Sequence, residues 1–193
     1  MGIEFELKYR ATEEAQAAIL EATEGNWQTI AMETTYYDTP AGSLSQRKCT
    51  LRRRYENGKS VCTLKTPAPG GARGEWETED GTIEAAIPKL CKLADPQLLP
   101  ILEAEGIMVV CGARFQRKCV TLDIGGTEVE LALDAGVLLG GGKEIPLCEL
   151  EVELKSGSRE AAAAFARLLA KKHGLQPEEK SKFRRALDLA KEL

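Results

Sequence analysis

The chain has 193 residues, of which 43% are hydrophobic and 29% are charged. This composition is typical of a soluble globular protein, and the length predicts a single domain covering residues 1–193. The net charge of −4 gives no general reason to bind nucleic acid or an anionic membrane. No apolar run approaches the roughly 18 residues that span a bilayer, and a strand-like pattern starts at once. We therefore expect neither a membrane span nor a signal peptide.

Six cysteines are scattered along the chain, none of them in a C-x-x-C pair, and His173 is the single histidine. Zinc sites normally combine closely spaced cysteines and histidines, so this pattern gives little support for a zinc site. Thiols on strand-like segments favour structural cysteines in a reduced, cytoplasmic protein.

The first strand-like stretch, residues 3–10, alternates strictly between apolar and charged residues, which predicts a β-strand with two unlike faces. The charged face carries Glu4, Glu6, Lys8 and Arg10. A similar stretch returns at residues 149–155, with Glu149, Glu151 and Glu153 in phase. Side by side, the two strands would place up to five carboxylates on one surface. Such like charges repel one another, and a divalent metal is the usual means of offsetting that repulsion.

The first half of the chain continues with a helix at residues 11–23, beginning near Thr12, and a strand at residues 27–38. The turn residues at 39–42 follow. Strands are then predicted at residues 49–55, 59–66 and 73–77. The first two are joined by a hairpin turn at residues 56–58, and the last two by a flexible connection at residues 67–71.

The second half begins with a helical region at residues 83–105, which we expect to be broken near Pro88, Pro96 and Pro100. Strands are predicted at residues 108–123 and 128–134, joined by a hairpin turn at 124–127. A glycine loop at 140–142 comes next, and Pro146 introduces the strand at 149–155. Ser158 opens a helix that Gly174 ends, and Pro177 starts the last helix. The pattern of about eight strands predicts an α+β fold with an antiparallel sheet.

Charged residues line up on one face of most predicted strands. Arg52 and Arg54, for example, share a face while Arg53 points away. Either these faces look into bulk water, or the sheet closes into a barrel with charges inside and apolar residues outside under helices. The composition favours the barrel, because Arg and Glu dominate faces where Ser, Thr, Gln and Asn would also be expected. Glu and Lys are otherwise depleted in strands. Enclosed charges must be paired or coordinated.

Such a cavity would select a small, dense polyanion. Arginine binds phosphate through bidentate hydrogen bonds, and carboxylates bind Mg²⁺ or Mn²⁺, which bridge phosphate oxygens. No G-x-x-x-x-G-K-[ST] loop occurs, so the phosphate would not be held in P-loop fashion.

An ordered set of motifs resembles the CYTH superfamily, also called triphosphate tunnel metalloenzymes. The motifs, in chain order, are Glu4-x-Glu6-x-Lys8, Tyr36-Tyr37-Asp38-Thr39-Pro40, Leu51-Arg52-Arg53-Arg54, Thr63-Leu64-Lys65, Arg73-x-Glu75-x-Glu77, Arg117, Glu130-x-x-x-Asp134-x-Gly136, Glu149-x-Glu151-x-Glu153, and Lys180-Ser181-Lys182 with Arg185. The resemblance covers nearly the whole chain. It implies an eight-stranded antiparallel β-barrel, flanked by helices, that holds a triphosphate and one or two Mg²⁺ or Mn²⁺ ions.

The resemblance also implies roles for individual residues. Metal would be bound by Glu4, Glu6, Glu130, Asp134, Glu149, Glu151 and Glu153. Phosphate oxygens would be held by Lys8, Arg52, Arg54, Lys65, Arg73, Arg117, Lys182 and Arg185. Lys8, Glu75 and Glu77 would act in catalysis, Lys8 by orienting the substrate and the two carboxylates by positioning water or a second metal. For Arg73, Lys180 and Arg185 a surface ion pair is an equal alternative, as it is for Arg114 and Lys118.

The chain looks most similar to bacterial inorganic triphosphatases, so the hypothesis is metal-assisted hydrolysis of the terminal phosphoanhydride of inorganic triphosphate. Thiamine triphosphate hydrolysis and cyclisation of ATP are alternatives within the same tunnel. A polyphosphate- or nucleotide-binding module without turnover is a third. We expect a small-molecule substrate, no nucleic acid or membrane partner, and a monomer or homodimer.

Overall fold

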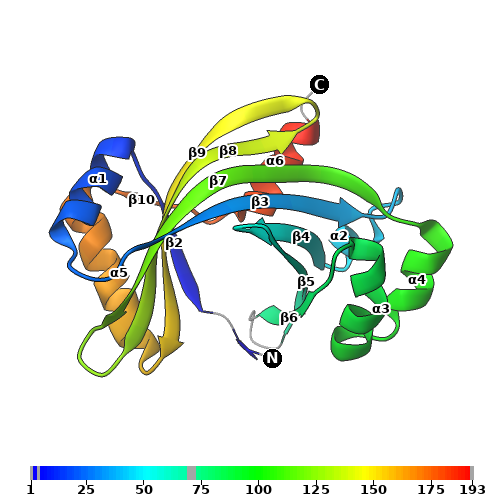
Figure 1. Cartoon of the computed structure of the whole chain (residues 1–193), viewed down its shortest axis with the longest axis horizontal. Helices are drawn as coiled ribbons and strands as arrows, with labels where there is room; N and C mark the ends of the chain where they lie inside the picture. Colours follow the sequence, from blue (N-terminus) through cyan, green and yellow to red (C-terminus); the bar gives the residue numbers. More distant parts are fainter. Residues whose placement is uncertain (1, 4, 69–72, 192–193) are drawn as a thin grey trace.

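The computed structural model describes residues 2–3, 5–68 and 73–191, and its strands form one strongly curved antiparallel sheet (Figure 1). The strands are β1 (Gly2–Ile3), β2 (Glu6–Arg10), β3 (Gln28–Asp38), β4 (Thr50–Glu56), β5 (Lys59–Pro67), β6 (Arg73–Glu79), β7 (Met108–Asp123), β8 (Glu128–Gly140), β9 (Lys143–Ser156) and β10 (Gln176–Pro177). The predicted α+β class and antiparallel sheet are confirmed. The metal ligand expected at Glu4 and most of the connection expected at 67–71 lie outside the described residues.

The order of strands across the sheet is β1-β6-β5-β4-β3-β7-β8-β9-β2-β10. The N-terminal segment therefore contributes near both edges: β1 forms one edge, where Gly2 pairs with Glu75 of β6, and β2 lies next to the edge strand β10, where Glu6 pairs with Glu153 of β9. No backbone ladder between described strands joins the two edges, so the expectation of a closed eight-stranded barrel was wrong. The single predicted strand at residues 3–10 is divided between β1 and β2, which lie at or near opposite edges of the sheet (Figure 1).

Tight turns set the registers of the central hairpins. Asn57 and Gly58 have φ values of 50° and 87°, as a type I′ turn between β4 and β5 requires. Gly141 and Gly142, at φ values of 59° and 75°, make the corresponding turn between β8 and β9. The strands on either side of this turn are much longer than predicted, and β9 runs through Pro146 instead of starting after it.

The helices are α1 (Glu13–Ala22), α2 (Ser43–Gln46), α3 (Ile83–Ala94), α4 (Leu98–Glu105), α5 (Arg159–His173) and α6 (Lys182–Lys191). Thr12 and Ser158 cap α1 and α5 by accepting from the backbone N–H groups three residues on, and Gly174 ends α5 at a φ value of 66°. These boundaries agree with the predictions. None of the helices in the described ranges is both long enough and apolar enough to cross a membrane.

Prolines had different effects from those expected. The break between α3 and α4 lies at Pro96, but Pro88 is inside α3. Pro100 lies in the first turn of α4, where the missing N–H would have no helical partner anyway. Pro177 does not start the last helix: it belongs to β10 and pairs with Tyr9, so α6 begins only at Lys182.

The two faces of the sheet differ in chemistry. On the convex face, Leu51 and Leu64 lie in a buried cluster with α3 and α4, and Leu131 and Val152 lie in a second cluster with α1 and α5. The concave face carries most of the in-phase charges. A third cluster, including Met32, Phe115 and Leu187, packs α6 against the concave side of β7 and β8.

Gly140 allows α6 to approach the sheet closely. A Cβ atom at this position would lie 2.2 Å from the carbonyl oxygen of Ala186 and 2.8 Å from the backbone nitrogen of Ala190. The end of β8 therefore accommodates the backbone of α6 only because Gly140 has no side chain. This contact holds the middle and the last turn of α6 against the end of β8.

Candidate functional site

The concave face of the sheet encloses a cavity of about 760 Å³. Charged side chains make up most of its lining. They are Glu6, Lys8, Arg52, Arg54, Glu56, Lys65, Arg73, Glu75, Glu77, Arg117, Glu130, Glu151, Glu153, Lys155, Glu179, Lys180, Lys182 and Arg184. The arrangement with charges facing the inside, favoured by the sequence, is therefore the one observed.

One wall is formed by neighbouring positions of β2, β9 and β8. Glu6 lies opposite Glu153, which in turn lies opposite Glu130. Two lysines pair with this acidic row: Lys8 Nζ is 3.3 Å from Glu6, and Lys155 Nζ is 2.9 Å from Glu153 and 3.8 Å from Glu130. Lys155 was not predicted as a site residue, although it continues the alternation of Glu151 and Glu153.

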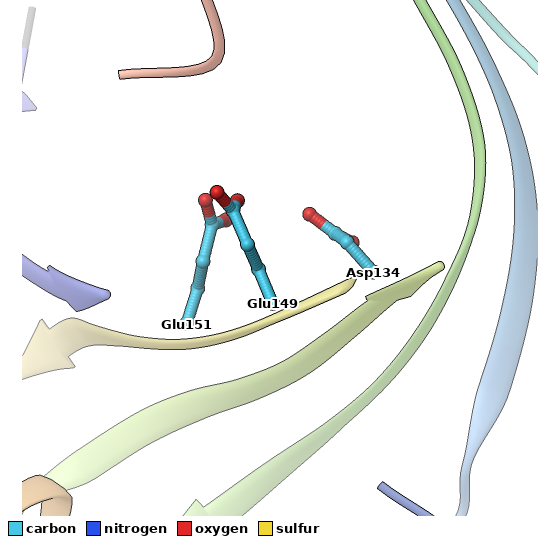
Figure 2. A group of neighbouring side chains, drawn as sticks. All are labelled: Asp134, Glu149 and Glu151. Carbon is cyan, nitrogen blue, oxygen red and sulfur yellow. The ribbon is translucent and has the colours of Figure 1, made fainter. Parts of the chain in front are cut away.

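Next to this row, three carboxylates of β8 and β9 converge on Lys182. Its ammonium nitrogen lies 2.9 Å from Asp134, 2.5 Å from Glu149 and 2.6 Å from Glu151. Figure 2 shows the three carboxylates on the same side of the sheet. Their oxygens lie within 4.8 Å of one another, a spacing at which they could hold a metal ion.

Arg117 completes this cluster from β7. Its guanidinium forms a bidentate pair with Asp134, at 2.8 and 2.7 Å, and a further contact with Glu151. The fork-shaped guanidinium suits two parallel bonds to one carboxylate. Arg117 thereby ties β7 to β8 and β9 on the cavity side.

Two opposing effects set the pKa values in this cluster: burial disfavours the charged forms, and the oppositely charged neighbours favour them. Burial opposes the charged forms of Lys182 and Arg117, but their carboxylate partners more than offset it and raise the pKa of both. The pKa of Glu151 is lowered, because Lys182 and Arg117 outweigh its burial. At Glu149 burial dominates, and the pKa is raised despite Lys182 and Arg185.

The opposite wall comes from β4, β5 and β6. Arg52 lies 3.2 Å from Glu75 and 3.8 Å from Glu77, and Lys65 lies 3.2 Å from Glu75. Thr63 donates to Glu77 at 2.9 Å. These pairs arise because Lys65 and Thr63 lie directly opposite Glu75 and Glu77 in the β5–β6 register. The predicted catalytic carboxylates and phosphate-binding cations are thus already in contact.

Arg54 and Arg73 line other parts of the cavity. Arg54 Nε donates to Glu56 at 2.6 Å, and burial together with the adjacent Arg52 lowers the pKa of Arg54. Glu56 was not predicted as a site residue; it continues the phase of Arg52 and Arg54 beyond the part of the strand considered. Arg73 donates to the carbonyl oxygen of Lys48 at 3.1 Å.

Three predicted site residues lie behind the lining. Asp134 and Glu149 have fully buried side chains, and Arg185 reaches Glu149 at 2.7 Å and Glu178 at 3.0 Å. Strand phase brings Asp134 and Glu149 to the concave side of the sheet, but α6 covers them there, and Arg185 belongs to α6 itself. By contrast, Arg114 pairs with Glu144 on the exposed surface, as one of the two interpretations held.

Two groups of carboxylates could hold a metal, and they differ in the cations that already pair with them. Lys182, Arg117 and Arg185 already neutralise the carboxylates of Asp134, Glu149 and Glu151, so a metal there would compete with Lys182. In the described acidic row, two lysines pair with three carboxylates. Carboxylate oxygens suit Mg²⁺ and Mn²⁺, so this row, which lines the cavity, is the second place for a divalent cation.

Comparison with known families gives one model that covers almost the whole chain: the CYTH domain model matches residues 2–187. An inorganic triphosphatase of Haemophilus influenzae is 29% identical over 133 residues, which are 68% of this chain and 38% of the relative. The matched part therefore spans well under half of that relative's length.

Solved structures with the same fold are more distant in sequence. The Hippeastrum protein HpAC1, a proposed adenylyl cyclase that reveals a dominant triphosphatase activity, is 19% identical with a TM-score of 0.63, over 100% of this chain and 98% of that chain. The PH1819 protein of Pyrococcus horikoshii OT3 is 22% identical with a TM-score of 0.65, over 96% of this chain and 99% of that chain. At these identities the likeness shows the fold.

Proposed function

Because this chain belongs to the CYTH domain family, we propose that it hydrolyses the terminal phosphoanhydride of inorganic triphosphate with Mg²⁺ or Mn²⁺ as cofactor. The observation that carries the proposal is the cavity of about 760 Å³, in which basic and acidic side chains of the same wall lie in contact. The sequence similarity to the Haemophilus influenzae inorganic triphosphatase supports the choice of substrate.

The cations that line the cavity hold the phosphate oxygens in this proposal. Arg52, Lys65 and Lys182 are now paired with carboxylates, and a phosphate chain would replace those partners. The exchange keeps each cation paired with an anion, so the ammonium and guanidinium groups need little reorganisation on binding. Arg54 and Arg117 extend the same set toward the middle of the sheet.

The carboxylates that face the cavity would hold the metal: Glu6, Glu151 and Glu153, with Glu130 beside them. When bound, a divalent cation would neutralise phosphate oxygens and help align the anhydride for in-line attack. Asp134 and Glu149 act indirectly in this scheme, because they fix Lys182 from behind. On the opposite wall, Glu75 and Glu77 orient the attacking water and accept its proton.

Phosphate release measures the activity directly. The purified chain is incubated with tripolyphosphate, thiamine triphosphate or ATP, each with Mg²⁺ and Mn²⁺ separately and with EDTA. We expect orthophosphate to be released fastest from tripolyphosphate, and none to be released in EDTA. Tripolyphosphate binding without release from any of the substrates would instead indicate a binding module and overturn the proposed hydrolysis.

Adjacent arginines provide a matched test of the cavity. Arg52 faces the cavity, whereas Arg53 faces away and stacks on Tyr55 with its guanidinium 4.9 Å from the ring centre. Loss of one charge-assisted contact corresponds to about a 10- to 100-fold effect. We expect Arg52→Gln to lower kcat/KM for tripolyphosphate by that factor and Arg53→Gln to change it less than threefold. Equal losses would remove the support for a cavity-bound phosphate.

Metal dependence is tested at Glu6, which lines the cavity and has no partner role in the buried cluster around Lys182. We expect Glu6→Ala to raise the Mn²⁺ concentration needed for half-maximal activity and to lower kcat. Wild-type turnover of Glu6→Ala together with an unchanged half-saturating Mn²⁺ concentration would exclude Glu6 as a metal ligand.

An organic triphosphate is a second candidate substrate, because part of the cavity wall is apolar. Ile30, Met32, Phe115 and Phe183 line it beside the charged residues. These side chains could contact a thiazole or adenine ring. Release of phosphate only from thiamine triphosphate, or conversion of ATP to a cyclic product, would favour this candidate over inorganic triphosphate.

A further inference from the structure

The cations of α6 depend on a short connection that runs along the edge of the sheet. β10 pairs with β2, through Gln176 opposite Arg10 and Pro177 opposite Tyr9. The backbone N–H of Glu178 then donates to the carbonyl oxygen of Lys8 at 2.9 Å. Only three residues, 179–181, separate this last edge contact from Lys182. The position of Lys182 in the cavity is therefore sensitive to how this connection is held.

Glu178 holds the connection with its side chain as well as its backbone. The side chain is 2% exposed and accepts from Arg10 Nε at 2.6 Å and from Arg185 Nη1 at 3.0 Å. It also accepts from the backbone N–H of Lys180 at 2.9 Å. One carboxylate thus joins β2, the connection and α6.

The contacts of Glu178 continue into the cavity wall as alternating charges. Arg185 lies between Glu178 and Glu149, 3.0 Å from the first and 2.7 Å from the second, and Glu149 lies 2.5 Å from Lys182. Each charge in this row is buried between two opposite charges. Removal of one member leaves its neighbours unpaired in a poorly hydrated interior, and they must move or change protonation.

The buried Glu178 carboxylate, with its several partners, differs from the carboxylates of exposed surface ion pairs. The pairs contributed by Arg10, Lys180 and Arg185 lower its pKa from 4.5 to about 2 despite its burial, so it is ionised throughout the neutral range. The carboxylate of Glu144, in contrast, is 53% exposed and pairs with Arg114, which is 56% exposed. Exposed pairs of this kind contribute little.

We propose that Glu178 is a positioning residue for phosphate binding, which acts through Arg185 and Glu149 to hold the ammonium of Lys182 in the cavity wall. The proposal rests on the proposed function, since it takes triphosphate as the ligand that Lys182 meets. Glu178 does not line the cavity and does not touch the substrate. Its effect is on the placement of a cation that does.

Equilibrium binding tests the proposal without requiring turnover. The full chain and its variants are titrated with tripolyphosphate by calorimetry, in buffer without divalent metal and again with Mg²⁺. We expect Glu178→Gln, which keeps the shape but removes the charge, to weaken binding about tenfold, the size of one charge-assisted contact. The matched control Glu144→Gln removes an exposed carboxylate–arginine pair between strands and leaves the affinity unchanged within twofold.

A double-mutant cycle separates positioning from a general loss of structure. If Glu178 acts through Arg185, Glu178→Gln weakens binding less than twofold once Arg185→Gln is present, because the connection to Lys182 is already broken. A merely structural role predicts the same tenfold effect in both backgrounds. Should Glu178→Gln not fold, Glu178→Asp keeps the charge but shortens its reach, and about a threefold loss is expected.

The outcomes for Glu178 and for the proposed function are distinguishable. Equal affinity of the wild-type chain and the Glu178 variant, or additive effects in the cycle, overturns the role of Glu178 alone. Binding by the wild-type chain without phosphate release from any triphosphate overturns the hydrolysis alone. Failure of the wild-type chain to bind tripolyphosphate overturns both.

Discussion

Replacement of Lys182 by methionine is the most informative single test of stability, because it removes one cation from a largely buried group of balanced charges. Three carboxylates, of Asp134, Glu149 and Glu151, now face three cations, of Lys182, Arg117 and Arg185. The side chains of Asp134 and Glu149 are fully buried, and that of Lys182 is 10% exposed. Without Lys182 one negative charge is left uncompensated in this interior.

The expected loss of stability is about 3–5 kcal/mol at pH 8, the range observed when one partner of a buried ion pair is removed. For a chain of this length each 1 kcal/mol lowers the midpoint of thermal unfolding by roughly 2–4 °C, so the midpoint should fall by about 6–20 °C. Urea unfolding followed by circular dichroism measures the free energy directly. Lys180→Met is the matched control: Lys180 is 58% exposed and pairs with Asp188, so its loss should be within about 1 kcal/mol.

The loss of unfolding free energy caused by Lys182→Met should become smaller as the pH is lowered from 8 to 5. Burial already raises the pKa of Glu149 in the wild-type chain, and loss of Lys182 removes the main opposing cation. A carboxyl whose folded pKa lies above its unfolded value takes up its proton first in the folded state. Its protonation therefore stabilises the fold at low pH, and that stability is lost as the pH rises. Equal destabilisation by Lys182→Met and Lys180→Met at pH 8, or a deficit that grows on acidification, would refute the reasoning.

Three further outcomes are expected. Gly140→Ala forces a Cβ to within 2.2 Å of a backbone oxygen of α6, so it should lower both the unfolding midpoint and the affinity for tripolyphosphate, while Gly81→Ala, which meets open space, should change neither. Glu178 should stabilise the wild-type chain by on the order of 3 kcal/mol above about pH 5, at about 1.4 kcal/mol per pKa unit, and this contribution should be lost as the pH falls toward 2. The urea midpoint of Glu178→Gln should therefore fall less than that of the wild-type chain over the same pH range. Finally, Mn²⁺ should raise the melting temperature of Lys182→Met more than that of the wild-type chain, because the three carboxylates then lack their ammonium.

Each of these outcomes has a contrary result. A Gly140→Ala protein with wild-type affinity would mean that α6 tolerates displacement. An unchanged acid dependence in Glu178→Gln would assign the acid response to other carboxylates. An equal Mn²⁺ effect on both proteins would mean that the metal binds away from the site of Lys182.

Local sequence rules predicted most elements well, because their signals are contained within a few residues. The strands β3 and β7 follow from alternation and β-branched or aromatic residues, and Thr12, Ser158 and Gly174 mark helix ends through their capping groups. The division of the first strand between two sheet edges is different in kind. It depends on how far the whole sheet curls, and no residue between 3 and 10 encodes that distance.

Strand phase predicted the side of the sheet on which site residues lie, but not their depth. Glu149 and Glu151 are in phase, yet Glu151 lines the cavity and Glu149 is buried behind it. The difference comes from α6, whose start was expected at Pro177. Pairing of Pro177 with β2 delays the helix to Lys182, and this delay decides which carboxylates the helix covers. Lys155 and Glu56 continue the phase of rows already identified, so the same rule could have found them, but neither was predicted as a site residue.

The division of the N-terminal segment between β6 and β9 has a practical consequence for handling the protein. Deletion of residues 1–10, or a rigid fusion partner that draws them away, would leave both β6 and β9 with unpaired backbone groups. Exposed strand edges recruit strands from other molecules, so such preparations should precipitate or form oligomers. A cleavable tag at the other terminus would leave both edges covered.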